Sequence, residues 1–386
     1  MATPARPPEG SKPVLLPRVA SALFLLFVFL LGVKLLGSGF RLLGEDLIQG
    51  FFAATENPFV GLVVGLLATT LVQSSSVTTS MVVAMVAAPE NPLPLANAIP
   101  MVMGANIGTT VTSTIVSLAH LGRRDEFERA FPVAVCHDIF NYLSVLILLP
   151  LEMTTGFLRR TATILAKPFS GMSGVDYESP LDTVLNVGLT PVRALVELAT
   201  DTDGGRALVF IALSALFIFF ALFFLVKVLR VVAHTRVETA VHDALGQRAV
   251  VSIFVGIAVT IMVQSSSITT SVLVPLAGAG LLRLEQAFPV TIGANIGTTV
   301  TALLAAMAVS GPNASAGLEI ALVHLLFNLS GLLVVYPVER IRRVPLDAAR
   351  LAARWAVRSR KMTVLFIAVL FYGLPSLFIA IAQWLR

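Results

Sequence analysis

Charged residues are scarce in this chain, and their scarcity excludes a soluble globular protein. Asp, Glu, Lys and Arg make up 13% of the 386 residues, hydrophobic residues make up 56%, and the mean hydropathy is +0.88. A soluble domain carries about a quarter charged residues. The composition therefore predicts an all-α polytopic membrane protein embedded in a lipid bilayer.

Cysteine is nearly absent, and several chemical motifs are missing. The single cysteine, Cys136, excludes an internal disulfide. The sequence has no His/Cys/Glu cluster with transition-metal spacing, no phosphate-binding loop ending in Gly-Lys-Ser/Thr, and no nucleophile–base pair. We therefore expect no enzyme, no cofactor and no metal other than Na⁺, with an ion gradient as the energy source. The net charge of +5 does not indicate nucleic acid, because the basic residues fall largely in loops between apolar segments.

Long polar strings that occur twice are the main feature present. QSSSVTTS at 73–80 corresponds to QSSSITTS at 264–271, and GANIGTTVT occurs unchanged at 104–112 and 293–301. A His-x-x-Phe-Asn sequence follows each pair, beginning at His137 and at His324. Unrelated segments would not share polar strings while the apolar residues around them differ. The chain therefore contains two copies of one unit.

The basic residues predict how the apolar segments are oriented. Lys and Arg cluster in the loops near 123–129, 227–236 and 340–361, which the positive-inside rule assigns to the cytoplasm. A consistent path then requires segments 57–88 and 250–281 to enter and leave on the same side, as re-entrant hairpins. Each unit has three crossings plus one hairpin, so the two units have opposite orientations. We predict two inverted-topology repeats, each with a re-entrant hairpin and a broken transmembrane helix, as in secondary transporters.

This path divides the chain into six parts. They are a cytoplasmic N-terminal tail (1–18), repeat unit 1 (19–152), an external linker (153–206), repeat unit 2 (207–340), a basic cytoplasmic surface helix (341–361) and a C-terminal membrane segment (362–386). The last segment either crosses the membrane once or bends back at its centre, Gly373-Leu374-Pro375-Ser376. The sequence leaves both courses open.

The duplicated strings carry the chemistry expected of an ion and anion site. The glycines that flank Asn106 and Asn295 are expected to break both helices, exposing N–H groups that attract anions and carbonyls that coordinate Na⁺. Amide and hydroxyl oxygens are neutral, hard ligands that suit a small alkali cation, and hydroxyl and amide donors suit phosphate or a carboxylate. Gln73, Asn106, Thr109 and Asn295 are therefore candidate Na⁺ ligands.

Four ionisable residues need separate interpretations. Asp138 is the only carboxylate deep in a repeat-unit span, where such groups are costly and usually functional; the alternative is a local pair with His137 or Arg129. The second unit has leucine at the equivalent place. His137 and His324 are either proton sites or neutral packing residues with one hydrogen bond. Arg124, in a predicted cytoplasmic turn, either sets topology or contacts an anionic substrate.

The duplicated QSSS, GANIGTT and His-x-x-Phe-Asn strings resemble those of the type II sodium-dependent phosphate cotransporters. The resemblance runs from Gly61 to Glu152 and from Gly256 to Glu339, and the short termini and linker resemble those of bacterial members. It implies inward cotransport of inorganic phosphate with Na⁺ across the cell inner (plasma) membrane, by an elevator-like movement. A Na⁺-coupled transporter of another oxyanion or a dicarboxylate is the alternative, and a homodimer is considered alongside a monomer.

The resemblance also implies roles for individual residues. The serines of both QSSS strings would hold phosphate: Ser74, Ser75, Ser76, Ser266 and Ser267, with Arg124 as a further candidate. One Na⁺ site would be formed by Gln264, Ser265, Thr298 and Thr301. Asp138 would bind an additional Na⁺, as in electrogenic members, which favour divalent phosphate with three Na⁺.

Overall fold

The structure is a computed structural model. It describes residues 15–42, 53, 55–72, 74–118, 120–170, 180–221, 224, 249–309, 311–377 and 380. In this part of the chain every regular element is a helix. Five helices are long and apolar enough to cross a membrane: Leu95–Leu118, Arg124–Thr155, Asp203–Ala221, Leu284–Met307 and Ala314–Val335. The predicted all-helical class is confirmed, and the apolar helices agree with a polytopic membrane protein.

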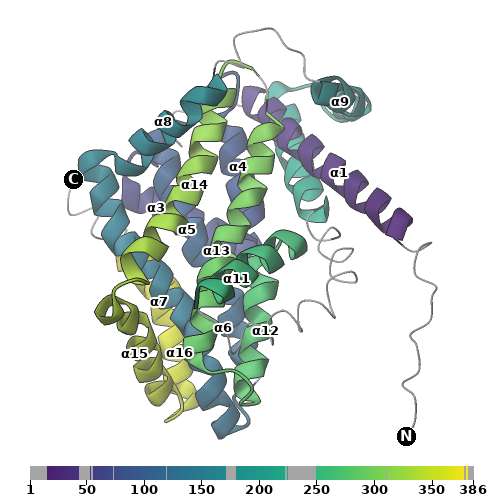
Figure 1. Cartoon of the computed structure of the whole chain (residues 1–386). Coiled ribbons are helices and arrows are strands. Elements are labelled where there is room, and N and C mark those ends of the chain that lie inside the picture. Colours follow the sequence, from purple (N-terminus) through teal and green to yellow (C-terminus); the bar gives the residue numbers. More distant parts are fainter. Residues whose placement is uncertain are drawn as a thin grey trace, which may run out of the picture.

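The helices follow the order of the two units and are labelled in Figure 1. Their bounds are α1 Leu15–Leu42, α3 Pro58–Val72, α4 Ser75–Val86, α5 Leu95–Thr109, α6 Val111–Leu118, α7 Arg124–Thr155, α8 Phe157–Ser170, α9 Pro180–Ala199, α11 Ala249–Val263, α12 Ser266–Gly278, α13 Leu284–Met307, α14 Ala314–Val335, α15 Glu339–Ala356, α16 Arg360–Ala368 and the π-helix η1 Val369–Gly373.

In the first unit, α3 and α5 lie in parallel with their backbones in contact. Gly61 faces Asn97 near the two helix starts, and Gly108 faces Thr69 near the two ends. A Cβ atom at Gly104 would lie 1.9 Å from the carbonyl oxygen of Leu62, far inside van der Waals contact. Only glycine permits this close approach.

The second unit repeats the arrangement with α11 and α13. A Cβ atom at Gly293 would lie 2.1 Å from the carbonyl oxygen of Ile253, and one at Gly297 would lie 2.7 Å from Cβ of Thr260. The glycines of both GANIG strings therefore have the same packing role in the two units.

The expectation of a broken helix is wrong for the second unit, and in the first unit the break falls after the glycines rather than at them. Helix α13 runs without interruption from Leu284 to Met307, through the whole second GANIGTTVT string. In the first unit the helix that carries this string is interrupted at Thr110, between α5 and α6. The physical reason is that the glycines admit a neighbouring helix backbone, and this contact needs a regular helix on both sides.

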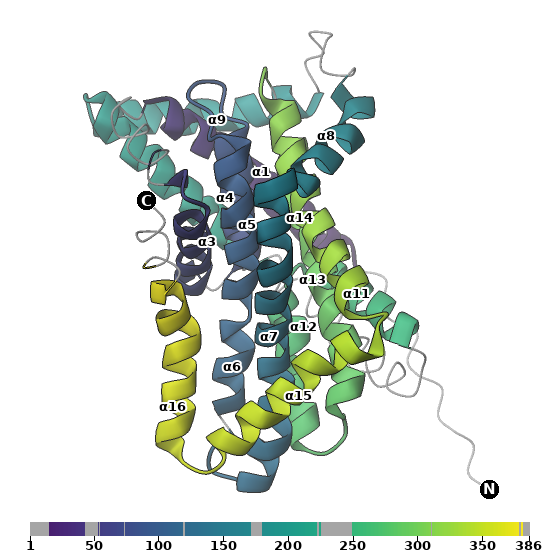
Figure 2. The ribbon, with the colours of Figure 1, turned by 90° about the vertical axis from the view of Figure 1, so that its left-hand side faces the viewer.

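The helices that begin with the serine strings lie in opposite halves of the molecule. In Figure 1, α4 lies in the upper half and α12 in the lower half. In Figure 2, α15 crosses the lower half in front of α7, against which it packs through Phe127, Phe131 and Val135 of α7. The predicted helix at 341–361 thus exists as α15, which begins at Glu339.

Two segments, the predicted linker and the C-terminal segment, contain structure that the sequence did not specify. The predicted linker 153–206 contains α8 and α9, and a 2.7 Å hydrogen bond from Thr163 to Glu319 attaches α8 to α14. Both helices are amphipathic, so they lack the long apolar runs by which the other helices were predicted. The C-terminal segment stays helical through η1 to residue 377, the last of the continuous described stretch, with no reversal in this part at the Gly-Leu-Pro-Ser sequence.

Candidate functional site

The two serine strings adopt the same local structure. Ser74 caps the N-terminus of α4 and accepts a 3.3 Å hydrogen bond from the Val77 amide; Ser265 caps α12 and accepts a 3.4 Å bond from the Ile268 amide. Serine is favoured at this position because its oxygen satisfies a free amide of the first turn. We call Ser74–Ser76 the first serine turn and Gln264–Ser267 the second serine turn.

Gln264 has a backbone conformation that side chains rarely adopt. Its φ is 54°, in the left-handed region. Such a conformation costs free energy in a residue other than glycine and persists only where the surroundings stabilise it. Its amide provides that stabilisation, donating 2.7 Å to the carbonyl of Ile261 and accepting 3.0 Å from the Thr301 hydroxyl. Gln73, the equivalent residue, lies outside the described residues.

The two serine turns meet at Thr301 of α13. The Thr301 hydroxyl donates to Oε1 of Gln264 in the second serine turn and lies 3.5 Å from the Ser76 hydroxyl in the first. Ser113 of α6 shares a 2.7 Å hydrogen bond with Thr270 of α12, whose hydroxyl also lies 3.0 Å from the Ser266 carbonyl. Polar residues from both units, far apart in sequence, therefore form one buried cluster.

Several serine hydroxyls in this cluster have no hydrogen-bond partner among the described residues. Ser75 is 5% exposed and Ser266 2% exposed, yet in the described part of the chain neither hydroxyl makes a hydrogen bond, and nor does that of Ser267. All three sit in the first turns of α4 and α12, where unpaired amides carry partial positive charge. Two helix N-termini with free hydroxyls, brought together at Thr301, are suited to bind an anion.

A chain of buried Asn and His side chains also links the two units. The Nε2 atom of His137 lies 2.7 Å from Oδ1 of Asn295, and Nδ2 of Asn295 donates over 2.7 Å to Oδ1 of Asn141. Asn141 in turn donates to the backbone carbonyl of Asn106. The packing interpretation of His137, with one hydrogen bond, matches this geometry.

The sequence-equivalent residues do not repeat this chain. Asn328 donates to Oδ1 of Asn106 over 3.2 Å, while Asn106 donates back to its own helix at Val102. Both ring nitrogens of His324 and Oδ1 of Asn328 are buried without a partner among the described residues. The network that contains His137 is therefore hydrogen-bonded along its length, whereas the equivalent His324 has no hydrogen-bond partner among the described residues.

Asp138 lies beside α6 rather than beside the basic residues considered as its partners. It is fully buried, and its Oδ2 accepts a 2.9 Å hydrogen bond from Thr114; the Thr110 side chain also interacts with the carboxylate, while Oδ1 itself makes no hydrogen bond of normal geometry in the described region. No ion pair with His137 or Arg129 is formed: His137 bonds to Asn295, and Arg129 donates to the Gly278 carbonyl. A buried carboxylate with a free oxygen is an environment that a cation would stabilise.

The threonines predicted to bind Na⁺ divide into two kinds. The hydroxyls of Thr109 and Thr298 each donate a 3.0 Å hydrogen bond to the backbone carbonyl four residues earlier, that of Ala105 and that of Ala294. Their oxygens keep lone pairs that could face a cation. Thr301, in contrast, is already in contact with both serine turns.

Comparison with known proteins assigns the chain to a family. The model of the Na⁺/Pi-cotransporter family matches residues 28–172 and 216–378. The chain belongs to the Na⁺/Pi-cotransporter family.

Named relatives agree with this membership. Sodium-dependent phosphate transport protein 2A of Rattus norvegicus is 34% identical over an alignment of 437 residues, which covers 95% of this chain and 68% of that protein. Sodium-dependent phosphate transport protein 2B of Homo sapiens is 32% identical, over 93% of this chain and 64% of that protein. No solved structure matches the chain. The resemblance recognised in the duplicated strings is thereby confirmed.

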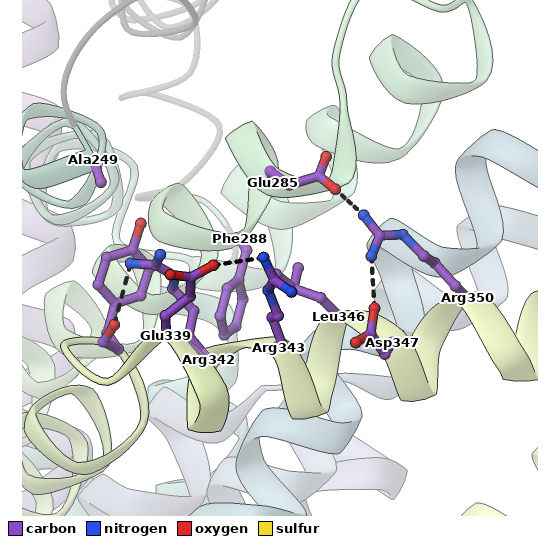
Figure 3. Close-up of a pocket in the computed structure, with 10 residues that line it drawn as sticks. Ala249, Glu285, Phe288, Glu339, Arg342, Arg343, Leu346, Asp347 and Arg350 are labelled. Carbon is purple, nitrogen blue, oxygen red and sulfur yellow. Dashed lines mark hydrogen bonds and ion pairs between the residues drawn. The ribbon is translucent and has the colours of Figure 1, made fainter.

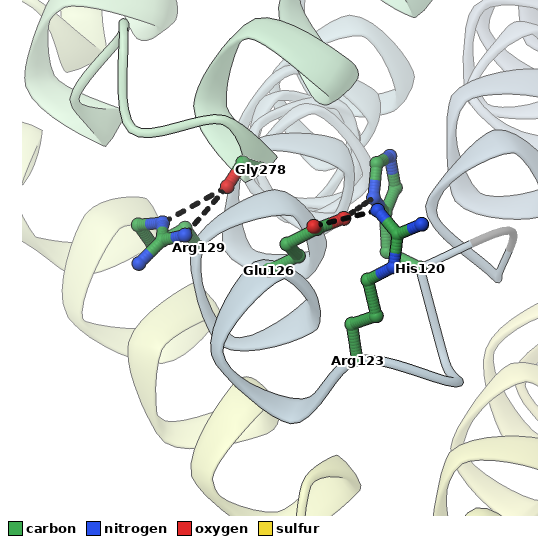
Figure 4. A network of polar contacts seen from close by, with 5 residues as sticks. All are labelled: His120, Arg123, Glu126, Arg129 and Gly278. Carbon is green, nitrogen blue, oxygen red and sulfur yellow. Dashed lines mark hydrogen bonds and ion pairs between the residues drawn. The ribbon is translucent and has the colours of Figure 1, made fainter.

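Arg124 is not brought to the serine turns of this family member. It begins α7 and is exposed; the neighbouring Arg123 pairs with Glu126, which also contacts His120 (Figure 4). One turn further on, Arg129 binds the carbonyl of Gly278, at the end of α12 farthest from Ser266. A 13-residue helix is about 20 Å long, so this turn and the second serine turn lie at opposite ends of α12.

Three polar residues of the cluster were missed in the sequence. Ser113 and Thr114 directly follow the first GANIGTTVT string, and Thr270 belongs to the second serine string. A signal was present for Thr270, because it lies inside a duplicated string. Ser113 and Thr114 could not be selected by duplication, because the second unit has Ala302 and Leu303 at the equivalent positions.

The two equivalent histidines are expected to differ in their importance for stability. His137→Leu leaves Oδ1 of Asn295 buried without its donor, which costs about 1–3 kcal/mol. His324→Leu removes ring nitrogens that have no partner in the described part, so it should be neutral or stabilising. Thermal unfolding of both purified variants in detergent tests this difference. Equal losses of stability would contradict the asymmetric network.

Proposed function

We propose that this chain couples Na⁺ entry to the inward transport of inorganic phosphate. The observation that carries the proposal is the meeting of two serine-capped helix N-termini at Thr301, within a member of the Na⁺/Pi-cotransporter family. The named relatives are sodium-dependent phosphate transport proteins, which supports the same substrate and coupling ion here.

Phosphate would bind between the serine turns. Ser74, Ser75, Ser76, Ser266 and Ser267 would donate hydroxyl or backbone N–H groups to its oxygens, and the two helix dipoles would favour its negative charge. Charge-assisted hydrogen bonds of this kind are roughly twice as strong as neutral ones. Arg124, the first residue of α7, would contact phosphate only after it leaves the serine turns.

Sodium would bind to the neutral oxygens around this anion. Gln264, Ser265, Thr298 and Thr301 would form one site, with Gln73, Asn106, Thr109 and Asn295 as further ligands in the duplicated strings. These side chains carry no charge, so they suit an ion that must bind and leave in each cycle. Asp138, with its free Oδ1, would hold an additional Na⁺ and make transport electrogenic.

Transport would follow alternating access in an inverted repeat. Helices α3–α4 and α11–α12 would be re-entrant hairpins whose tips are the serine turns, and the placement of α4 and α12 in opposite halves of the molecule supports an inverted relation of the units. An elevator-like movement of the substrate-binding part would then expose the site to each side in turn. We place the protein in the plasma membrane, as a monomer or a homodimer.

The alternative is a Na⁺-coupled transporter of another oxyanion, and competition distinguishes the two. Arsenate has nearly the shape and charge of phosphate, so it should compete with radiolabelled phosphate for uptake about as well as unlabelled phosphate does. Sulfate carries no proton at neutral pH to donate to a serine or amide oxygen, and should compete poorly. The measurement is uptake into proteoliposomes under a Na⁺ gradient. Sulfate competing as well as arsenate would favour the alternative.

A further inference from the structure

A pocket outside the serine turns lies where the start of α13, the end of α14 and α15 come together (Figure 3). Its volume is about 490 Å³. Phe288 and Leu346 form an apolar wall, and six of its ten lining residues are charged. None of these residues belongs to the duplicated polar strings.

The charges of the pocket balance overall but are separated in space. Arg342, Arg343 and Arg350 are opposed by Glu285, Glu339 and Asp347, so the formal sum is zero. Arg343 pairs with Glu339, and the remaining charged residues give the two ends of the pocket different net charges.

One end carries a surplus of negative charge and the other a surplus of positive charge. Arg350 pairs with two carboxylates at once, Glu285 and Asp347. Arg342 pairs with no carboxylate in the described structure and instead lies over the ring of Tyr336, 5.1 Å from its centroid. Figure 3 shows Arg342 at one side of the pocket and Asp347 with Arg350 at the other.

The pairs in the pocket are open to exchange with a ligand. The side chain of Arg350 is 45% exposed and that of Glu285 49% exposed. Ion pairs as exposed as this contribute little to stability, because water competes for both partners. A ligand that brings its own charges can therefore replace them at small cost.

We propose that this pocket binds the headgroup of a zwitterionic glycerophospholipid with a primary amine, as in phosphatidylethanolamine. The phosphate diester would lie at the Arg342–Arg343 side, and the ammonium at the Glu285–Asp347 side. An anionic headgroup such as glycerol phosphate offers nothing to the carboxylates. A choline headgroup carries the positive charge but has no N–H to donate to them.

The surroundings favour a lipid over free phosphate or a free headgroup. Val338 is 49% exposed and Val344 47% exposed, and each is next in the chain to a lining residue. Exposed apolar side chains beside a charged pocket at the end of a candidate membrane span are where acyl chains and headgroup would meet.

Lipid retention measured by native mass spectrometry tests the proposal. The purified full chain is mixed with equal amounts of phosphatidylethanolamine, phosphatidylcholine and phosphatidylglycerol, and the bound lipids are counted. Phosphatidylethanolamine should be retained preferentially. Arg342→Gln and the double variant Glu285→Gln/Asp347→Asn should each lower its retention about tenfold, as expected for one charge-assisted contact. The control is Arg354→Gln, an exposed arginine of α15 that does not line the pocket, which should retain the lipid as wild type does.

Three results would overturn the proposal. Preferential retention of phosphatidylglycerol would mean a basic site, and equal loss in the Arg354→Gln control would mean non-specific adsorption. Displacement of the lipid by inorganic phosphate would assign the pocket to free phosphate.

Size-exclusion profiles establish that the variants are folded. The unfolding temperature gives a second readout: phosphatidylethanolamine should raise it in wild type more than in either pocket variant.

Discussion

Alanine at Ser75 or at Ser266 is expected to lower Na⁺-driven phosphate uptake by about 10- to 150-fold. Each substitution removes one hydroxyl donor from a desolvated anion, a loss of roughly 1.5–3 kcal/mol for a charge-assisted hydrogen bond. Every tenfold in rate or affinity corresponds to about 1.4 kcal/mol. The fold should be retained, because neither hydroxyl bonds to another part of the described protein. The measurement is radiolabelled uptake in proteoliposomes at matched protein content.

Ser80→Ala is the matched control for these two variants. Ser80 lies in the same helix as Ser75 and is fully buried, but its hydroxyl donates a 2.7 Å hydrogen bond to the backbone carbonyl of Ser76. Its loss should leave uptake near the wild-type level. If Ser75→Ala and Ser266→Ala transport as well as this control, the serines are packing residues and phosphate binds elsewhere.

Asp138→Gly is expected to leave Na⁺-driven uptake present but insensitive to membrane potential. Three Na⁺ with one divalent phosphate carry one positive charge inward, whereas two Na⁺ carry none. The free Oδ1 of Asp138, beside Thr114, is where the additional Na⁺ would bind. Moving one charge through 100 mV is worth about 2.3 kcal/mol, which is large enough to see clearly. The measurement is uptake into vesicles whose potential is set by valinomycin and K⁺.

Asp125→Asn provides a comparison for this variant. Asp125 is on the same helix but exposed in its first turn, so removing its charge should leave the voltage response unchanged. An Asp138→Gly protein that responds to voltage as wild type does would exclude Asp138 as the charge-setting ligand. Its buried carboxylate would then have a structural role through Thr114.

The candidate site could be selected from the sequence because its residues are duplicated. Polar strings preserved twice among changing apolar residues identified the serine turns, and the structure brings Ser76 and Gln264 together on Thr301. The family could be recognised from the same strings. What the strings could not reveal is which helix faces meet, since that depends on packing between distant segments.

The role of the glycines was misjudged for a physical reason. Glycine lowers helix propensity, which led to the expectation of broken helices around Asn106 and Asn295. In a membrane protein, glycine also lets two helix backbones touch, and at Gly104 and Gly293 the contact with Leu62 and Ile253 outweighs propensity. A sequence pattern alone does not distinguish these uses.

The difference between His137 and His324 could not be read from the sequence at all. Both stand in the same His-x-x-Phe-Asn string, yet only His137 is hydrogen-bonded to the asparagine of the opposite unit. Identical local sequences receive different partners because the two units are packed differently around them. Asp138, in contrast, could be singled out, because the string itself changes to Leu325 in the second unit.

The most direct test of the account is the dependence of phosphate uptake on the cation outside the vesicle. Purified protein is reconstituted into proteoliposomes, and radiolabelled phosphate uptake is compared under inward gradients of Na⁺, Li⁺ and K⁺. A site built from neutral amide and hydroxyl oxygens of a fixed size should accept Na⁺ and support uptake poorly with the other two ions. Uptake that requires the Na⁺ gradient is the predicted result. Equal uptake with K⁺ and Na⁺ would contradict Na⁺-coupled phosphate transport by this protein.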